Sequence, residues 1–312
     1  MTTVEAPSIP ATAIRHRPSG IWRPALRNRK VAIGLLLLAF FVFAAIAHPL
    51  FQATIWADAR AVFHPKTGFD VAIQHPSGLS ATHWLGTDSL GRDVVSMFTF
   101  AAGPTVLLGL VTAFVIGLVS LAAGAGAAYW RGAVDGTVTH LGDALVLLPP
   151  PLAIFIIGAG RSLGPVVIGI VYGIMFGLGP ATAAVRAAAF TVLAKPFVEA
   201  AHAAGGGARW ILGRHVVPHL VPHVTVQMSI GVTGAIITYA FLQFFSGVGA
   251  ETSFGAMVYS GITFQGLFAG EAPWGVLIAG AMGISLLAAA FYSLGVGLRE
   301  VFDPRLRAAG RR

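Results

Sequence analysis

The chain has 312 residues, of which 56% are hydrophobic and only 10% are charged. An ordinary soluble domain carries about 25% charged residues, so this chain has too little polar surface to cover a water-soluble core of its size. The composition argues against a soluble enzyme and against a disordered protein. Cysteine is absent, which excludes disulfides, thiolate nucleophiles, and iron–sulfur or cysteine–zinc sites.

Long stretches free of Asp, Glu, Lys and Arg predict membrane-spanning helices, because about 20 apolar residues cross roughly 30 Å of hydrocarbon. They predict an all-α membrane protein with six spans, at about residues 31–49, 101–130, 144–160, 163–185, 224–246 and 273–298. A seventh charge-free stretch, 252–270, carries Thr, Ser, Gln and several glycines, and we interpret it as a loop or re-entrant segment. Pro149–Pro151 predict a kink in the third span, which either serves a gate or is a passive bend.

Basic residues are distributed unevenly between the two ends of these spans. Sixteen Lys and Arg residues fall on the side of the termini and four on the other side. The positive-inside rule therefore predicts that both termini are cytoplasmic. We expect a cytoplasmic tail at 1–30 with a short interfacial helix from Trp22 to Lys30, a transmembrane domain at 31–298, and a cytoplasmic tail at 299–312. Because the charge brackets the membrane, it indicates no nucleic-acid partner.

The predicted spans carry essentially no ionisable residues away from their ends, whereas transporters driven by ion gradients usually do. The GxxxxGK[ST] loop that binds ATP is absent, as are HExxH and GxSxG. No pair of residues within the spans reads as a nucleophile and base. A self-contained secondary transporter and an intramembrane enzyme are therefore the weaker hypotheses, and we expect the energy source to lie in another chain.

The segment 195–222 between the fourth and fifth spans is the most informative part of the sequence. Pro196 can open a helix, and Glu199 then falls in its first turn, where the helix dipole favours a carboxylate. The glycines 205–207 stop that helix. A second helix should run from Ala208 to about Val217 and end at Pro218. This helix–turn–helix unit presents small residues outward and could dock in a groove on a partner.

Several motifs together resemble a known family. EAAHAAG at Glu199–Gly205, followed by HVVP ending at Pro218, resembles the EAA loop of binding-protein-dependent ABC importer permeases. Within that family, the chain most resembles the C-type permease subunit of the dipeptide, oligopeptide and nickel importers. Four further stretches carry that resemblance: LRNRKVAIGLLLL at 26–38, HWLGTDSLGRDVVS at 83–96, APWGVLIAG at 272–280 and LGVGLREVFDPRLR at 294–307. The sequence GVGAETSFGAMV at 247–258 departs from the Gln-Pro-Pro-rich loop usual there.

The resemblance implies a type I ABC importer permease fold in a bacterial plasma membrane. It implies that this chain forms half of a pathway for di- or oligopeptides, with nickel or a metal chelate as the alternative cargo. The implied partners are a second homologous permease, two cytoplasmic ATPases that bind ATP and Mg²⁺, and an extracytoplasmic solute-binding protein. The chain itself would hold no cofactor and no catalytic or metal-ligating residue. The implied ATPase-coupling residues are Glu199, Ala200, Ala201, His202, Ala204, Gly205 and Pro218.

Simpler interpretations stand beside these. Glu199 could merely stabilise its own helix, by about 0.3–1 kcal/mol. His215, His219 and His223 recur at helical spacing, but Pro218 and Pro222 interrupt that helix, so interfacial histidines are favoured over a metal site.

Asp88, Arg92 and Asp93 could form an outer substrate site, although a salt-bridged cap on an amphipathic helix lying on the membrane is favoured. The glycines at 103, 109, 117, 124 and 126 favour tight helix crossings over pore lining.

Overall fold

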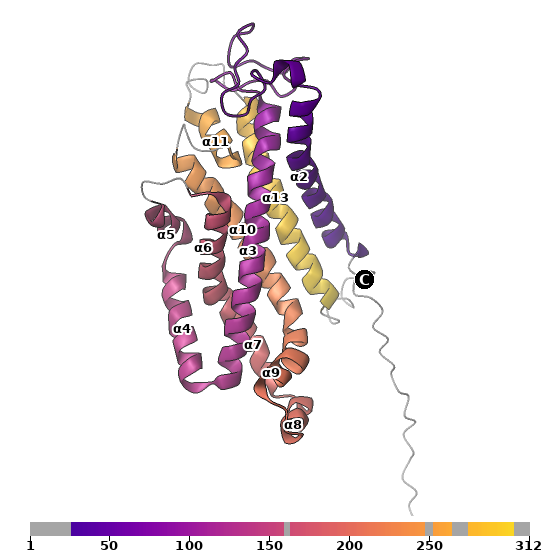
Figure 1. Cartoon of the computed structure of the whole chain (residues 1–312), viewed down its shortest axis with the longest axis vertical. Helices are drawn as coiled ribbons and strands as arrows, with labels where there is room; N and C mark the ends of the chain where they lie inside the picture. The colour runs from indigo at the N-terminus through magenta and orange to yellow at the C-terminus, as the bar shows by residue number, and fades with distance from the viewer. Residues whose placement is uncertain (1–25, 159–162, 247–251, 264–273, 303–312) are drawn as a thin grey trace, which may run out of the picture.

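The computed structural model describes residues 26–158, 163–246, 252–263 and 274–302. Within these ranges the chain is an elongated bundle of helices (Figure 1), and extended backbone pairs only in an isolated bridge between Thr87 and Asp93. The helices are α2 Arg29–Ala53, η1 Ala57–Ala59, α3 Val94–Trp130, α4 Gly132–Leu147, α5 Pro150–Ile157, α6 Pro165–Phe176, η2 Gly177–Ala181, α7 Thr182–Leu193, α8 Pro196–Ala203, α9 Ala208–Ile211, η3 Leu212–Val216, α10 Val217–Ser246, α11 Phe254–Thr263 and α13 Trp274–Phe302.

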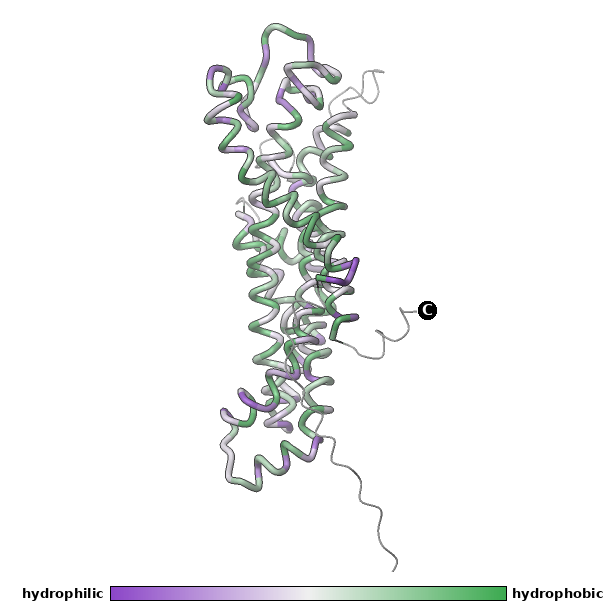
Figure 2. The backbone as a smooth tube through the Cα atoms, turned by 90° about the vertical axis from the view of Figure 1, so that its right-hand side faces the viewer, coloured by the Kyte–Doolittle hydropathy of each residue, from purple (hydrophilic) through white to green (hydrophobic). Residues whose placement is uncertain are grey.

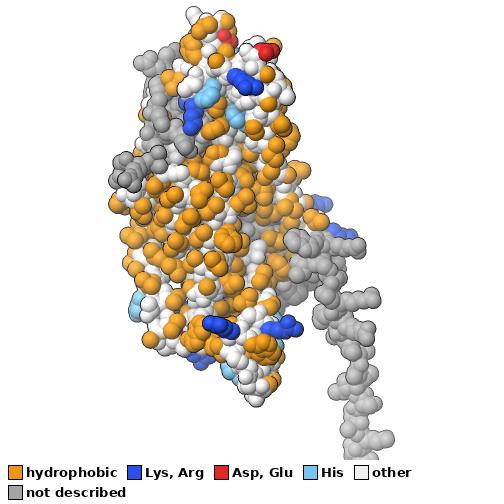
Figure 3. Space-filling model, in the orientation of Figure 1, with side chains coloured by type: hydrophobic (Ala, Val, Ile, Leu, Met, Phe, Trp, Pro, Cys, Tyr) orange, Lys and Arg blue, Asp and Glu red, His pale blue; other side chains and the backbone are white. Residues whose placement is uncertain are grey.

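Five helical runs among the described residues are long and apolar enough to cross a membrane: 29–53, 94–130, 165–193, 208–245 and 274–302. The pair α4 and α5 makes a sixth candidate, bent by 87° at its break. Along the backbone hydrophobic residues run through the length of the bundle, and hydrophilic residues gather at its two ends and in one patch at mid-height (Figure 2). Hydrophobic side chains also cover the middle of the face in Figure 3, as the surface of a protein embedded in lipid requires.

The helix α3 is the centre of the bundle and contacts α2, α6, α7 and α10. Glycines allow its closest approaches. A Cβ built on Gly173 of α6 would lie 2.7 Å from Val115, and one on Gly124 of α3 would lie 2.9 Å from Val185 of α7. Small residues at helix crossings in a bilayer let backbones approach and gain van der Waals contact. The expectation that span-two glycines serve helix packing therefore holds for Gly124.

The third span differs from the predicted 144–160. Its first helix, α4, begins at Gly132, so the residues between the predicted second and third spans are largely helical. The turn is confined to Arg131 and Gly132, whose φ angles are 49° and 54°. Asp135 and Asp143 interrupt the charge-free stretch, yet Asp135 pairs with Arg186, which is 51 residues away in sequence. The break at the prolines is present, between Leu147 and Pro150.

Three further boundaries differ from expectation. Pro218 does not end a helix, because the π turn η3 leads from α9 directly into α10 and re-spaces the backbone bonds before the proline. The stretch 252–270 contains the helix α11, and its residues after Thr263 lie outside the described residues. The helix α2 begins at Arg29 with Asn28 as its N-cap and continues through Pro49. The proposed interfacial helix from Trp22 lies mostly outside the described residues.

Candidate functional site

The helix α8 stands at one extreme of the bundle (Figure 1). The neighbouring helix α3 has 37 residues, which at 1.5 Å per residue makes it about 55 Å long. A bilayer's hydrocarbon core is only about 30 Å thick. The helix α8 packs at the end of this long helix, contains Glu199 and is flanked by Lys195 and by Arg209 of α9, so we expect it to lie beyond the hydrocarbon core.

Local sequence explains the shape of α8. Pro196 occupies its first turn, where a missing N–H costs nothing, and Glu199 lies in the same turn. At the other end Gly205 adopts a φ of 81°, which favours glycine. The amides of Gly205 and Gly206 donate to the carbonyls of His202 (2.9 Å) and Ala201 (3.0 Å). This is the Schellman arrangement, which satisfies the last carbonyls of a helix and turns the chain sharply.

The two faces of α8 differ in burial. Val198 and Ala201 are buried against the bundle. The remaining predicted coupling residues on α8 and its turn are exposed: Glu199, Ala200, His202, Ala204 and Gly205. Pro218 is also exposed but lies apart, in the first turn of α10. The outward face is therefore a short strip in which the small residues Ala200, Ala204 and Gly205 accompany the larger side chains of Glu199 and His202. Such a strip lets a partner approach the backbone closely.

A contact that the sequence did not suggest joins α8 to the end of α3. The His202 ring stacks on Tyr129 with centroids 5.9 Å apart, and its Nε2 lies 3.4 Å from the Tyr129 hydroxyl. Between these elements lies a cavity of about 520 Å³, which Arg131 and Glu199 also line. Tyr129 ends the second span in sequence, so its only signal was an aromatic residue at a membrane border.

The three histidines after α8 do not converge on one point. The Trp210 ring meets His215 edge to face at 4.6 Å, and Phe197 stacks on His219 at 5.4 Å. The His219 Nδ1 lies 2.8 Å from the His215 carbonyl oxygen. Groups of His, Cys, Asp or Glu that could hold a metal are absent from the described part of the chain. His215 and His219 thus pack against the exposed aromatic side chains of Trp210 and of Phe197 in α8.

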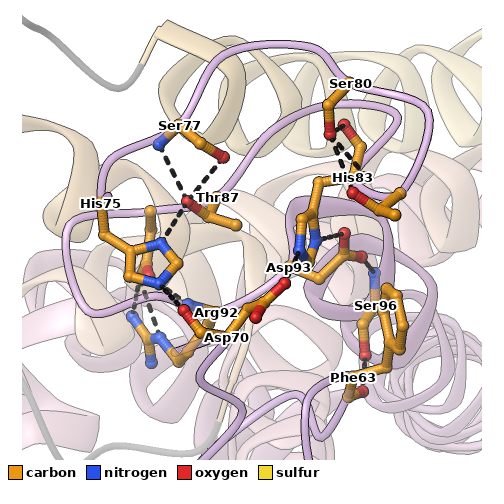
Figure 4. Close-up of polar contacts among 12 residues, drawn as sticks. Phe63, Asp70, His75, Ser77, Ser80, His83, Thr87, Arg92, Asp93 and Ser96 are labelled. Atoms are coloured by element: carbon orange, nitrogen blue, oxygen red, sulfur yellow. Dashed lines mark hydrogen bonds and ion pairs between the residues drawn. The ribbon is translucent and has the colours of Figure 1, made fainter. Parts of the chain in front are cut away.

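The opposite end carries a polar network, in the segment 54–93 that we call the outer cap (Figure 4). Asp88 is fully buried, and its Oδ1 accepts from the Arg92 amide at 2.8 Å. Its Oδ2 accepts from Arg92 Nε at 2.8 Å and from the Ser260 hydroxyl of α11 at 3.0 Å. The expected Asp88–Arg92 pair is thus present, but it closes a tight turn before α3 rather than an amphipathic helix. It also ties α11 to the cap.

His83 is the other centre of the outer cap. Its ring is fully buried, with Nδ1 2.9 Å from Asp93 and Nε2 3.4 Å from Asp70. Burial raises the pKa of Asp93, although the Ser96 amide and His83 oppose this shift. Hydrogen bonds from the Ala72 amide and then from His83 lower the pKa of Asp70. These contacts join the cap's loops to the first turn of α3, which is a structural rather than a chemical role.

Comparisons with known proteins agree on one kind of molecule. Residues 119–308 match the family described as binding-protein-dependent transport system inner membrane component. A probable peptide ABC transporter permease protein of Sinorhizobium fredii is 31% identical over 314 residues, covering 98% of each chain. The dipeptide transport system permease protein of Escherichia coli is 28% identical, covering 97% of each chain. The glutathione transport system permease protein of Pectobacterium atrosepticum is 28% identical, covering 97% of this chain and 96% of its own length.

Proposed function

The chain belongs to the family of binding-protein-dependent transport system inner membrane components, and we propose that it is one permease subunit of an importer for di- and oligopeptides. The observation that carries the proposal is the helix α8 at the end of the bundle, whose exposed face carries Glu199 and His202 among small residues and whose other face is buried against the bundle. Through the membrane, the bundle of α2, α3, α6–α7, α10 and α13 with the bent pair α4–α5 would form one half of the translocation pathway.

Peptides are the proposed cargo because relatives that match nearly the full length are named for peptides, dipeptides and glutathione. The described spans carry few charges, so they offer few residues that could couple transport to an ion gradient. Uptake of a labelled dipeptide and of ⁶³Ni²⁺ by the reconstituted importer tests this assignment. Dipeptide uptake supports it, whereas nickel uptake alone would move the assignment to the metal-importing relatives.

Coupling to ATPase subunits is the proposed role of Glu199, Ala200, His202, Ala204 and Gly205. These residues form the exposed strip of α8 and its turn, where a larger side chain in place of Ala200, Ala204 or Gly205 would hold a partner away. Ala201 would act from the buried side by fixing α8 to the bundle, and Pro218 by starting α10. ATP and Mg²⁺ would be bound by two partner ATPases. A second permease and a solute-binding protein on the outer side would complete the assembly.

Co-purification tests the coupling role. The tagged chain is expressed with the products of its neighbouring genes, and the ATPase subunits retained in mild detergent are measured. Glu199→Arg reverses the charge of the exposed strip and is expected to remove most of the ATPase from the complex. Asp58→Arg makes the same change on an exposed residue at the opposite end and is expected to leave the ATPase bound.

Two results would contradict the proposed docking role and the proposed importer. Retention of the ATPase by Glu199→Arg at the level of Asp58→Arg would remove α8 from the docking surface. Absence of ATPase from every version, together with uptake by the purified chain alone in liposomes under a proton or sodium gradient, would replace the importer with a secondary transporter.

A further inference from the structure

The helix α4 is attached to the rest of the described bundle over a small area. Its only buried residue is Gly142, and large apolar side chains on its surface are exposed, with Leu141 at 52% and Leu147 at 82%. At its end the chain breaks and α5 departs at 87°. An element of this kind is easily displaced unless specific contacts fix it, because it gains little from packing.

The first specific contact is the seat of Gly142 on the π turn η2. A Cβ on Gly142 would lie 2.9 Å from the Leu178 carbonyl oxygen, so the two backbones touch. The turn itself departs from helical geometry at Gly179, whose ψ is −109°, and it contains Pro180. A cavity of about 60 Å³ lies between α4 and this turn. This close backbone contact fixes the position of α4 on the turn. It does not fix the angle of α4 relative to the neighbouring helices.

The second specific contact is an ion pair between α4 and α7. Arg186 approaches Asp135 with both Nε and Nη2, the latter 2.6 Å from Oδ2. The two side chains are 29% and 20% exposed, so water screens the pair only in part. The Arg186 guanidinium also lies 5.1 Å from the centre of the Phe190 ring, one turn further along α7. A two-point guanidinium–carboxylate contact fixes direction as well as distance.

The element that carries Arg186 leads straight to α8. The helix α7 ends at Leu193, and α8 begins at Pro196 after two intervening residues. A displacement of α8 is therefore imposed on α7, because the link is too short to absorb it. From α7 the displacement can reach α4 through Asp135, about one turn from the start of α4.

From these contacts we propose that Arg186 is a positioning residue that makes α4, and with it the bent helix α5, follow the movement of α8. Its ion pair with Asp135 is the part of the link that transmits direction, and the Gly142 seat is the pivot. The inference rests on the proposed function, since it assumes that an ATPase moves α8. It adds a step that neither the family nor the exposed strip of α8 assigns.

A charge-swap series in the reconstituted importer tests the proposal. The variants are Arg186→Gln, Asp135→Asn and the double exchange Arg186→Asp/Asp135→Arg. Each single variant is expected to keep its ATPase subunits and its ATP hydrolysis but to transport less substrate per ATP. The expected loss is about two- to fivefold, the change in an equilibrium that one partly exposed ion pair can cause. The double exchange is expected to recover transport, because the pair re-forms with its charges reversed.

A matched control comes from the pair Lys30–Glu300, which joins α2 to α13 with side chains 52% and 30% exposed. Lys30→Gln removes an ion pair of the same kind that is not connected to α8. It is expected to leave transport per ATP unchanged. Equal ratios in Arg186→Gln and Lys30→Gln would overturn the proposal, as would a double exchange that transports no better than the single variants.

A second measurement does not depend on removing the pair. Spin labels on the exposed residues Val134 of α4 and Thr191 of α7 report the separation of the two helices, and a label on Leu36 of α2 gives an external reference. Between the resting and the ATP-bound complex, the α4–α7 distance is expected to stay constant while both helices move relative to α2. A change in the α4–α7 distance would overturn the proposal. Loss of ATPase from the wild-type complex would instead overturn the proposed function.

Discussion

Asp93 occupies the position at which the outer cap becomes α3. Its Oδ1 accepts from the Ser96 amide at 2.7 Å, and its Oδ2 lies 2.9 Å from His83 Nδ1. Asp93→Ala is expected to destabilise the chain by about 1–2 kcal/mol through loss of the N-cap. It also leaves a buried ring nitrogen without its partner, which adds to the loss. Asp93→Asn keeps a capping oxygen and should destabilise less. Thermal unfolding in detergent measures the difference, and equal midpoints for both variants would contradict this account.

Asp70 makes the stability of the outer cap depend on pH. Its pKa lies below the ordinary 3.8 because the Ala72 amide donates to it and His83 lies beside it. A depressed pKa means that the folded state favours the carboxylate. The stabilisation is complete above pH 3.8 and is lost as the pH falls toward the depressed value. Asp70→Asn is expected to weaken the decline of the unfolding midpoint below pH 3.8. An acid profile identical to that of the wild type would refute this role.

At the scale of elements, the packing of α2 on α13 makes a sharp prediction. A Cβ on Gly34 would lie 2.7 Å from the Ala290 carbonyl oxygen and 3.0 Å from the Leu294 amide. Gly34→Ala must separate two backbones and is expected to destabilise by about 1–3 kcal/mol. Gly103 of α3 is the control, because its Cβ would meet only Ala45 at 3.8 Å. Gly103→Ala should be neutral or slightly stabilising. Unfolding midpoints that fall equally in both variants would contradict the packing.

The same scale shows what could be predicted from sequence. Apolar length and charge-free runs located five of the spans, and the prolines at 149–151 located the break in the other. The missed features depend on distant partners. A charged residue such as Asp135 marks the end of a span in the sequence. Inside α4 it is accommodated because Arg186 of α7 pairs with it, so the beginning of α4 was missed. The π turn η3, which carries the helix through Pro218, leaves no local pattern.

The candidate site also contains features that the local sequence predicts and a contact that only the fold reveals. Glu199, Pro196 and the glycine turn are local signals, and the structure places them on one helix and its cap. The Tyr129–His202 contact joins residues 73 apart in sequence and required the fold. The coupling role itself stays a prediction until an ATPase is seen to bind there.

For the whole molecule, the unequal distribution of basic residues predicts which end faces the cytoplasm. The chain has no cysteine, so a single introduced cysteine can be labelled without background. Ser80→Cys in the outer cap and Ala203→Cys on α8 are both at exposed positions. A membrane-impermeant maleimide is expected to label the first in intact cells and the second only after the inner membrane is opened. The reverse pattern would invert the topology and place α8 out of reach of any cytoplasmic ATPase.

The unbroken length of α3 has a mechanical consequence. From Val94, which follows Asp93 of the outer cap, to Trp130, this helix passes through the bundle as one helix of 37 residues with Pro104 inside it. A rod that pivots near its middle moves its two ends in opposite directions, so a sideways force on the end near α8 becomes a countermovement of the outer cap. The neighbouring spans α4–α5 and α6–η2–α7 contain joints and would absorb part of the same torque. One continuous helix beside two jointed spans would thus allow the two ends of the molecule to move in opposite directions.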